Sequence, residues 1–369
     1  MNRMKLGEIL SVKHGWAFKG EYFAEDGEQS ILTPGNFFEK GGFKPNNGKE
    51  RYYTGIYPKE YLCHKGDLIV AMTQQAEGLL GSTALVPENN KYLHNQRIGL
   101  ITCDEKRLNK LFAYYLFMTK SVREQLERSS SGTKVKHTSP GKIYDVEVEI
   151  PDVISQQKIA NLLWFIDEKI ANNNAINDNL SAMAYDIYMH NFFSKKPNAK
   201  LKDILTEAEK SAIQVGEAKT SNGEYPFFTS GATILKWNEP FVDGRNCFLN
   251  TGGNADVKFY VGKAAYSTDT WSISAKSEMS DYLYLMLFSI KPELDQKFFQ
   301  GTGLKHLQKP LLKDRPIYVP EKRELEAFNR QVMPMFDIIS ENTRENQQLT
   351  SLRNWLLPML MNGQATISD

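Results

Sequence analysis

The sequence contains an internal repeat, and this repeat constrains the fold more than any other feature. The segment GTKVKH starts at Gly132 and returns as GTGLKH at Gly301, a shift of 301 − 132 = 169 positions. The same shift relates VEIP, which ends at Pro151, to IYVP, which ends at Pro320. Landmarks that recur in the same order predict two copies of one fold within the chain.

A long helix is predicted after each of these prolines, because apolar residues follow in steps of three and four. Both patterns have the same gap, and it is filled by asparagines that lie 169 positions apart. Such spacing is typical of a coiled coil, in which a polar seam residue fixes the register. The predicted interface consists of Ile159, Leu163, Ile166, Ile170, Asn173, Asn177, Leu180, Val332, Met335, Ile339, Asn342, Asn346 and Leu349.

The alternative is that each helix is an ordinary amphipathic helix packed on its own block. We favour an antiparallel pair, because it relates the two halves of a block–helix–block–helix chain by an approximate two-fold axis. Pro334 lies inside the second pattern and removes one backbone donor, so the helix is expected to kink there or to begin near it.

The two blocks each mix strand-like and helix-like segments. DLIVAM and YDVEVEI in the first block, and NCFLN and VKFYVG in the second, are typical of strands. KLFAYYLFMTKSVREQLER and DYLYLMLFSI are typical of helices. We therefore predict an α+β protein, with two mixed α/β domains at 1–150 and 196–319 that alternate with long helices at 151–195 and 320–369.

Further motifs keep a fixed order around the repeat, namely GWAFKGEYF from Gly15, KGDLIVAM from Lys65, NQRIGLI from Asn95 and the closing LLPMLMNG. Together with the duplicated layout, they resemble the specificity subunit of Type I restriction–modification systems over the whole chain. The resemblance implies two target-recognition domains, each reading one half of a split site in double-stranded DNA. It also implies helices that set the spacing and dock two modification subunits, with restriction subunits joining the full complex.

Candidate base readers follow from the chemistry of the major groove, where Arg and Lys suit guanine and Asn and Gln suit adenine. In the first block, GKERYY and TQQAEG offer Arg51, Gln74 and Gln75, with Tyr52 or Tyr53 beside them. In the second block, NTGGNADVK offers Asn250, Asn254 and Lys258, and its glycines would let the backbone approach DNA closely. The alternatives are solvated loop residues in the first block and a simple hairpin turn in the second.

The GT segments are candidate phosphate-binding loops. They carry Lys134, Lys136 and His137 in the first block, and Lys305 and His306 in the second. Cations bind the DNA backbone without reading sequence. The alternative is a structural turn whose lysine is merely solvated.

Signals for catalysis are missing from the sequence. It contains no Asn-Pro-Pro-aromatic motif, no Gly-Lys-Ser/Thr phosphate loop and no cysteine pair with zinc spacing. We therefore predict a binding module without cofactor or metal. The alternatives are an enzyme whose site assembles from distant residues and a coiled-coil scaffold that does not read DNA.

The composition indicates the compartment. Three separated cysteines suit a reducing environment, and the N-terminal segment does not have the pattern of a secretory signal. Because no apolar run reaches membrane-spanning length, we expect a cytoplasmic protein without a membrane partner.

Overall fold

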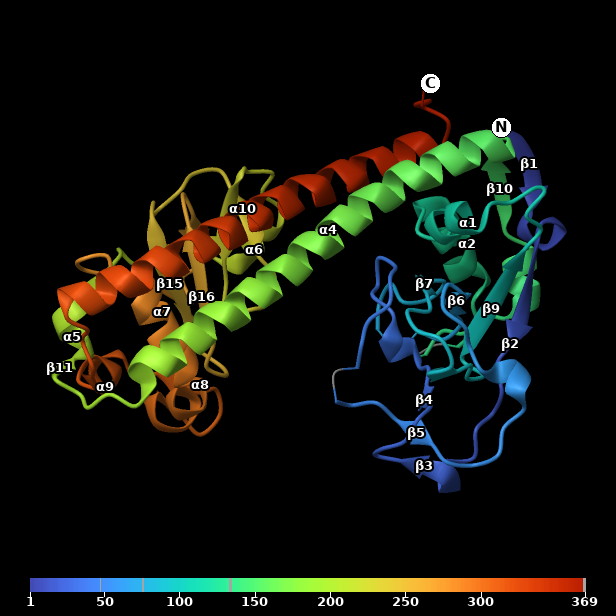
Figure 1. Ribbon diagram of the computed structural model, residues 1–369. Helices are drawn as coiled ribbons and strands as arrows, with labels where there is room; N and C mark the ends of the chain where they lie inside the picture. Colours follow the sequence, from blue (N-terminus) through green and yellow to red (C-terminus); the bar gives the residue numbers. More distant parts are fainter. Residues whose placement is uncertain (47, 75, 133–134, 368–369) are drawn as a thin grey trace. The chain divides into compact units, whose positions relative to one another are not determined.

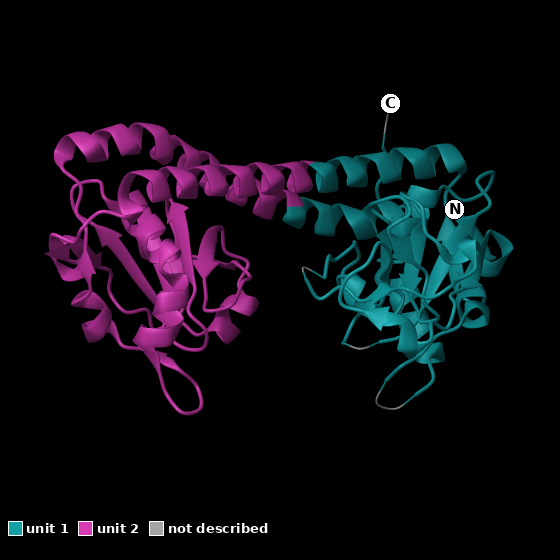
Figure 2. Cartoon of the chain, turned by 60° about the horizontal axis from the view of Figure 1, so that its bottom comes forward, with its two compact units in different colours: residues 1–168, 350–369 teal, residues 169–349 magenta. Residues whose placement is uncertain are grey.

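The computed structural model describes residues 1–46, 48–74, 76–132 and 135–367. The chain forms two compact units, of which unit 1 comprises residues 1–168 and 350–369 and unit 2 comprises residues 169–349 (Figure 2). Each unit contains one α/β block together with part of both long helices, α4 (Val153–Tyr188) and α10 (Lys322–Met361) (Figure 1). The chain therefore passes from one unit to the other only within helices.

The block of unit 1 is built on a four-stranded antiparallel sheet with the order β2-β9-β6-β7. The central strand β6 has four buried residues in sequence, LIVA, as expected for a strand covered on both faces. Helix α1 packs against β7 and β9, and its Phe112 and Tyr115 are fully buried in the core. The elements are β1 (Asn2–Lys5), β2 (Leu10–His14), β3 (Phe23–Ala24), β4 (Ser30–Ile31), β5 (Tyr52–Tyr53), β6 (Leu68–Ala71), β7 (Thr83–Leu85), β8 (Tyr92–Leu93), β9 (Ile98–Cys103), α1 (Lys110–Leu116), α2 (Lys120–Ser129), α3 (Pro140–Tyr144) and β10 (Glu147–Ile150).

The block of unit 2 is built on a four-stranded antiparallel sheet with the order β12-β18-β15-β16. Helix α7 packs against β15, β16 and β18 and buries Tyr282 and Leu283. The elements are β11 (Ala199–Lys200), α5 (Leu201–Ile204), β12 (Leu205–Glu207), α6 (Val215–Lys219), β13 (Tyr225–Phe228), β14 (Leu235–Trp237), β15 (Arg245–Asn250), β16 (Val257–Val261), β17 (Ala265–Tyr266), β18 (Thr270–Ala275), α7 (Ser280–Ser289), α8 (Lys291–Glu293), β19 (Phe299–Gln300), β20 (His306–Leu307), α9 (Lys309–Lys313) and β21 (Pro316–Ile317).

The two blocks have the same topology. The sheet β2-β9-β6-β7 corresponds to β12-β18-β15-β16, strand for strand. A second sheet in each block contains one parallel pair, β4–β8 in unit 1 and β13–β17 in unit 2. The first and last strands of each block also pair, β1 with β10 and β11 with β21. The predicted duplication of one α/β fold is therefore confirmed.

The long helices pair with opposite directions. In unit 2, Asn173 Nδ2 donates to Asn346 Oδ1 over 2.9 Å, and one turn further Asn342 Nδ2 donates to Asn177 Oδ1, also over 2.9 Å. The partner number falls as the number on α4 rises, so the pair is antiparallel, as predicted. In unit 1, Arg353 Nη1 on α10 donates to Asp167 Oδ1 on α4 over 2.5 Å.

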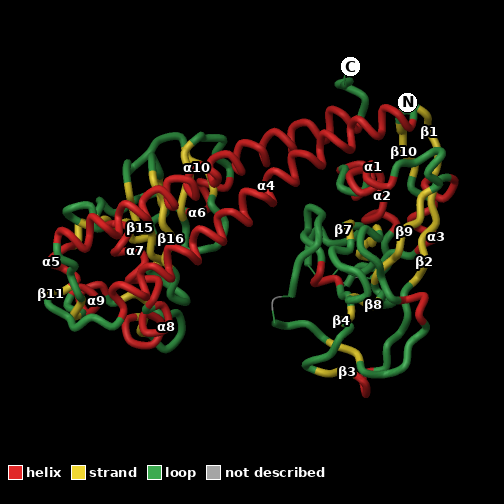
Figure 3. The backbone as a smooth tube through the Cα atoms, in the orientation of Figure 1, coloured by secondary structure: helices red, strands yellow, loops and turns green. Residues whose placement is uncertain are grey.

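Helix α10 is continuous (Figure 3). It includes Pro334, because it spans Lys322–Met361. It begins at Lys322, 334 − 322 = 12 residues earlier, so the expectation that it could begin near Pro334 is wrong. An internal proline costs about 3 kcal/mol or more, because one hydrogen bond is lost. Phe328, Val332 and Phe336 are buried against the core of unit 2, and this packing offsets that cost.

Polar contacts seat each block on a long helix. In unit 1, Tyr115 Oη donates to Asp167 on α4 over 2.7 Å. In unit 2, Arg245 donates to Asp281 and to Asp337 on α10, each over 2.6 Å. Burial raises the pKa of Asp281, and Arg245 partly opposes that shift. Each block is thereby fixed to a long helix, to α4 in unit 1 and to α10 in unit 2.

Within the described residues, no helix combines the length and the apolar character that a bilayer crossing requires.

Candidate nucleic-acid interface

The first block brings two of the predicted DNA-binding segments together. Gln74 N–H donates to the carbonyl of Lys136 over 2.9 Å, and Thr138 N–H donates to the carbonyl of Met72 over 2.9 Å. These two bonds tie the segment after β6 to the GT segment. The Nδ1 atom of His137 also lies 3.1 Å from Thr73 Oγ1, within hydrogen-bond distance.

The second block builds the same junction from different side chains. Gly253 N–H donates to the carbonyl of Lys305 over 2.9 Å, and Leu307 N–H donates to the carbonyl of Thr251 over 2.9 Å. The segment after β15 is thus tied to the second GT segment. We call each such junction a loop pair, which consists of residues 72–74 with 136–138 in unit 1 and residues 251–253 with 305–307 in unit 2.

The two halves of the loop pair are related by different shifts, and sequence comparison missed one of them. Lys136 and Lys305 differ by 305 − 136 = 169, whereas Met72 and Thr251 differ by 251 − 72 = 179. Strands β6 and β15 end at Ala71 and Asn250, which also differ by 179. An extra ten residues therefore lie between the two halves of the loop pair in the first block. A search at a shift of 179 would have aligned MTQ with TGG, but these letters share no recognisable pattern.

Glycine is required at the start of both GT segments. Gly132 has φ +99° and Gly301 has φ +148°, values that favour glycine. A Cβ atom would lie 2.1 Å from the carbonyl oxygen of Val135 at the first position and 2.5 Å from that of Leu304 at the second. The repeated glycine therefore makes a tight turn, which accounts for its recurrence.

Lys136 and Lys305 each pair with a carboxylate from the helical segment that precedes them. Lys136 Nζ contacts Glu127 of α2, and Lys305 Nζ lies 3.0 Å from Asp295 in the π-helical turn Leu294–Phe298. Asp295 also accepts a bond from Ala255 N–H over 3.0 Å. The Ala255 amide and the Lys305 ammonium together hold the pKa of Asp295 below its usual range.

The first predicted base-reading segment lies on the second sheet of unit 1. Arg51 is exposed, and its guanidinium carbon lies 5.3 Å from the centre of the Phe23 ring, beside a hollow of about 850 Å³. Tyr52 is half-buried in β5. Tyr53 is only 4% exposed and contacts the rings of Phe18, Tyr22, Phe23 and Tyr57. Tyr53 therefore belongs to the core of this sheet.

Gln74 lines a different hollow, of about 460 Å³, together with Glu127 and Arg123. Arg123 is a residue that sequence reasoning missed, because it lies in a run with an ordinary helical pattern. It donates to the carbonyls of Gly78 and Leu80 over 2.9 and 2.8 Å, and so shapes the segment after Gln74. Burial lowers the pKa of Arg123 to about 10.

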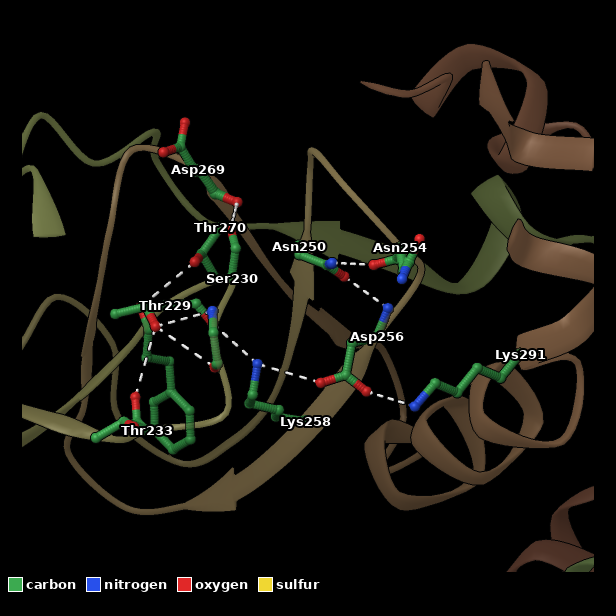
Figure 4. A network of polar contacts seen from close by, with 12 residues as sticks. Thr229, Ser230, Thr233, Asn250, Asn254, Asp256, Lys258, Asp269, Thr270 and Lys291 are labelled. Atoms are coloured by element: carbon green, nitrogen blue, oxygen red, sulfur yellow. Dashed lines mark hydrogen bonds and ion pairs between the residues drawn. The ribbon is translucent and has the colours of Figure 1, made fainter. Parts of the chain in front are cut away.

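Two of the candidates in the second block are occupied by contacts within the fold (Figure 4). Asn250 is 4% exposed, its amide donates to the carbonyl of Asn254, and its Oδ1 accepts from Asp256 N–H over 2.6 Å. Lys258 Nζ donates to the carbonyl of Thr229 over 2.9 Å and pairs with Asp256. These two side chains shape the hairpin, whereas Asn254 has an exposed side chain at its tip.

A basic aromatic site beside the second loop pair was also missed. Lys309 Nζ lies 4.9 Å from the centre of the Trp271 ring, and burial lowers its pKa. These two residues and Thr251 line a hollow of about 360 Å³. No local pattern in the sequence indicates this site, because Trp271 and Lys309 are far apart in the chain.

The remaining site candidates divide as follows. Gln75 and Lys134 lie outside the described residues. His137 and His306 are exposed. Ile159 and Leu163 are buried with the core of unit 1, and Val332 is buried with the core of unit 2. Ile166 is also buried, at 3% exposed. Ile170, Asn177, Leu180, Met335, Ile339, Asn342, Asn346 and Leu349 are half-buried, and Asn173 is buried.

The seam positions thus serve two kinds of packing. Leu163 and Leu360 share the core of unit 1, so α4, α10 and the block meet there. The helices therefore pack on the blocks and also pair with each other, so the two arrangements do not exclude one another.

No group of three or more potential metal ligands occurs among residues 1–46, 48–74, 76–132 and 135–367.

Two copies of one α/β block, each with a loop pair at the end of a central strand and each seated on an antiparallel helix pair, define a duplicated recognition protein. The chain belongs to the family of the Type I restriction modification DNA specificity domain, which matches residues 1–182 and 195–351. The family resemblance and the function of DNA recognition as a specificity subunit are thereby confirmed.

The chain is similar to two specificity subunits of Methanocaldococcus jannaschii. It is 21% identical to that of the Type I restriction enzyme MjaIX, over 70% of this chain and 69% of the relative. It is 22% identical to that of MjaVIII, over 45% of this chain and 39% of the relative. The crystal structure of the S subunit of a Type-I restriction-modification system from M. genitalium has the same fold, with a TM-score of 0.66 and 16% identity, over 100% of this chain and 96% of that one.

Proposed function

We propose that this subunit reads a two-part site in double-stranded DNA, with one part read by each block. The observation that carries this proposal is the loop pair, which the same two backbone hydrogen bonds build in both blocks. Two half-sites of different sequence require a common backbone frame that carries different side chains. The two loop pairs have the same backbone hydrogen bonds, and their side chains differ. The target-recognition domains would be residues 1–150 and 196–319, and the spacer helices would be residues 151–195 and 320–369.

Within each block, we assign phosphate contacts to the GT segment, through Lys136 and His137 in unit 1 and through Lys305 and His306 in unit 2. Lys134 would add a further cation. Cations and imidazoles at a repeated position suit the repeated geometry of the DNA backbone.

We assign base reading to the more variable half of the loop pair. In unit 1, Gln74 and Gln75 would read adenine, and Arg51 with Tyr52 would form a second contact region. In unit 2, Asn254 is the favoured reader, since its side chain is exposed and, among the described residues, makes none of the bonds that occupy Asn250 and Lys258. Those two residues and Tyr53 would maintain the shape of the site.

We further propose that α4 and α10 dock two modification subunits and that restriction subunits join the full complex. Large apolar side chains stay exposed on these helices, including Ile154 at 73%, Phe165 at 68% and Trp355 at 59%. Where exposed apolar side chains form a contiguous patch, they mark a protein interaction site. The subunit itself would not be catalytic, because the chemistry would belong to its partners. That it is cytoplasmic stays a prediction.

Exchange of one block tests the proposal. Residues 1–150 are replaced by the matching block of a related subunit with a different target, and methylated positions are mapped across the genome of cells that carry the complete system. We expect one half of the methylated site to change and the other half to stay. A change in both halves together would contradict independent reading by the two blocks.

A further inference from the structure

The same ion pair occurs beside both loop pairs, although the residues that form it differ. Lys136 pairs with Glu127, and Lys305 pairs with Asp295. The lysines are 169 positions apart, but the acids are 295 − 127 = 168 positions apart. One acid is a glutamate in an α-helix and the other is an aspartate in a π-helical turn. Both blocks therefore have the lysine–carboxylate pair, although the acidic residue and the type of helix that carries it differ between them.

The exposure of these pairs argues against a role in stability. The side chains of Lys136 and Glu127 are 35% and 55% exposed, and those of Lys305 and Asp295 are 41% and 34% exposed. Partly exposed ion pairs contribute little to folding, because water and salt screen them. Such a pair is easily exchanged for a stronger one, and a phosphate offers a charge-assisted hydrogen bond together with release of counterions.

We propose that Glu127 and Asp295 are internal counter-ions of the DNA-binding loops. They hold the two lysines in the free protein and release them to backbone phosphates when DNA binds. Each acid competes with phosphate for its lysine, so it weakens binding to every sequence. This inference rests on the proposed function, and it adds two residues that limit the affinity of the subunit for DNA.

Isosteric neutral substitutions test the role of the acids. Glu127→Gln and Asp295→Asn are made in the full chain, and binding to a random-sequence duplex is measured over a range of salt concentrations. We expect each substitution to tighten binding about two- to fivefold, the range that corresponds to one exposed ion pair. The log–log salt slope should also become steeper, by up to about 0.9 per lysine, because the lysine then meets a phosphate with its full charge.

A double-mutant cycle makes the test specific to the pair. In a Lys136→Ala background, Glu127→Gln should no longer tighten binding, and Asp295→Asn should likewise have no effect in a Lys305→Ala background. Glu124→Gln is the matched control, because Glu124 lies one turn earlier on α2 and pairs with Lys120 and Arg128. This control should change affinity less than Glu127→Gln does.

The outcomes separate this inference from the proposed function. If the unmodified chain does not bind duplex DNA, the proposed function itself is contradicted. If it binds but Glu127→Gln and Asp295→Asn leave affinity unchanged or weaken it in folded protein, only the counter-ion role is overturned. A gain that persists without the lysine, or that Glu124→Gln reproduces, also overturns it.

Discussion

His94 is a buried histidine whose two nitrogens have different environments. The side chain is 0% exposed, and its Nε2 lies 2.8 Å from the carbonyl of Ile98, to which it donates. Its Nδ1 has no hydrogen-bond partner within the described part of the chain. Burial disfavours the charged imidazolium and lowers the pKa of His94 to about 4.

This low pKa predicts a loss of stability in mild acid. The pKa of His94 is about 6.5 in the unfolded chain, so between pH 6.5 and pH 4 the unfolded chain binds a proton that the folded chain does not. The free energy of unfolding therefore has its full value above pH 6.5 and falls as the pH is lowered toward 4. The full effect is of the order of 3 kcal/mol. His94→Gln should flatten the pH dependence of urea unfolding in this window, whereas the exposed-residue control His14→Gln should not.

At the residue scale, the sequence offered candidate side chains for DNA contact, but it did not indicate which of them are buried. Asn250 and Asn254 have the same side chain and lie four positions apart, but one is buried in the turn and the other is exposed. Neighbouring Tyr52 and Tyr53 also differ, because Tyr52 is half-buried and Tyr53 lies in the core. Burial depends on which strand lies opposite, and no local pattern in the sequence encodes that.

At the scale of elements, the asparagine seam could be predicted because its spacing is local. Asn173 is 2% exposed and donates to Asn346 and to Glu345, which also pairs with Lys169. Such polar seam positions fix register at a cost in stability. The sequence alone could not decide whether α10 starts after Pro320 or near Pro334, because packing of Phe328 and Val332 overrides the local effect of Pro334.

Removal of polar residues from the seam should raise stability but make the register of the helix pair less specific. Replacing both partners, with Asn173→Leu and Asn346→Leu, should raise the free energy of unfolding by about 1–2 kcal/mol, because apolar packing replaces a buried amide pair. The same variant should lose its unique register and self-associate, as light scattering would reveal. Asn161→Leu, at an exposed position of α4, is the control. A fall in unfolding free energy would indicate that the amides stabilise the pair.

At the scale of the whole molecule, the repeat predicted the duplicated fold because its landmarks border the long helices. The middles of the blocks were less predictable. The first block has ten more residues between the two halves of its loop pair than the second block has, so a single shift of 169 does not align both halves. The only connections between the units lie within α4 and α10. If each block reads half of the DNA site, the length of these helices should set the unread gap between the halves.

Lengthening both helices together tests this dependence. Four residues are inserted after Asn177 in α4 and four after Glu341 in α10, so that Asn177 still faces Asn342 and Asn173 still faces Asn346. Four helical residues add close to one turn, or about 6 Å, and roughly keep the phase of the seam. Because DNA rises about 3.4 Å per base pair, the gap in the methylated site should grow by one or two base pairs, with both half-sites unchanged. Methylation mapping would measure it, and an insertion in α4 alone is the control, since it breaks the register and should abolish methylation. A folded, active variant with the original gap would show that the helices do not set the spacing.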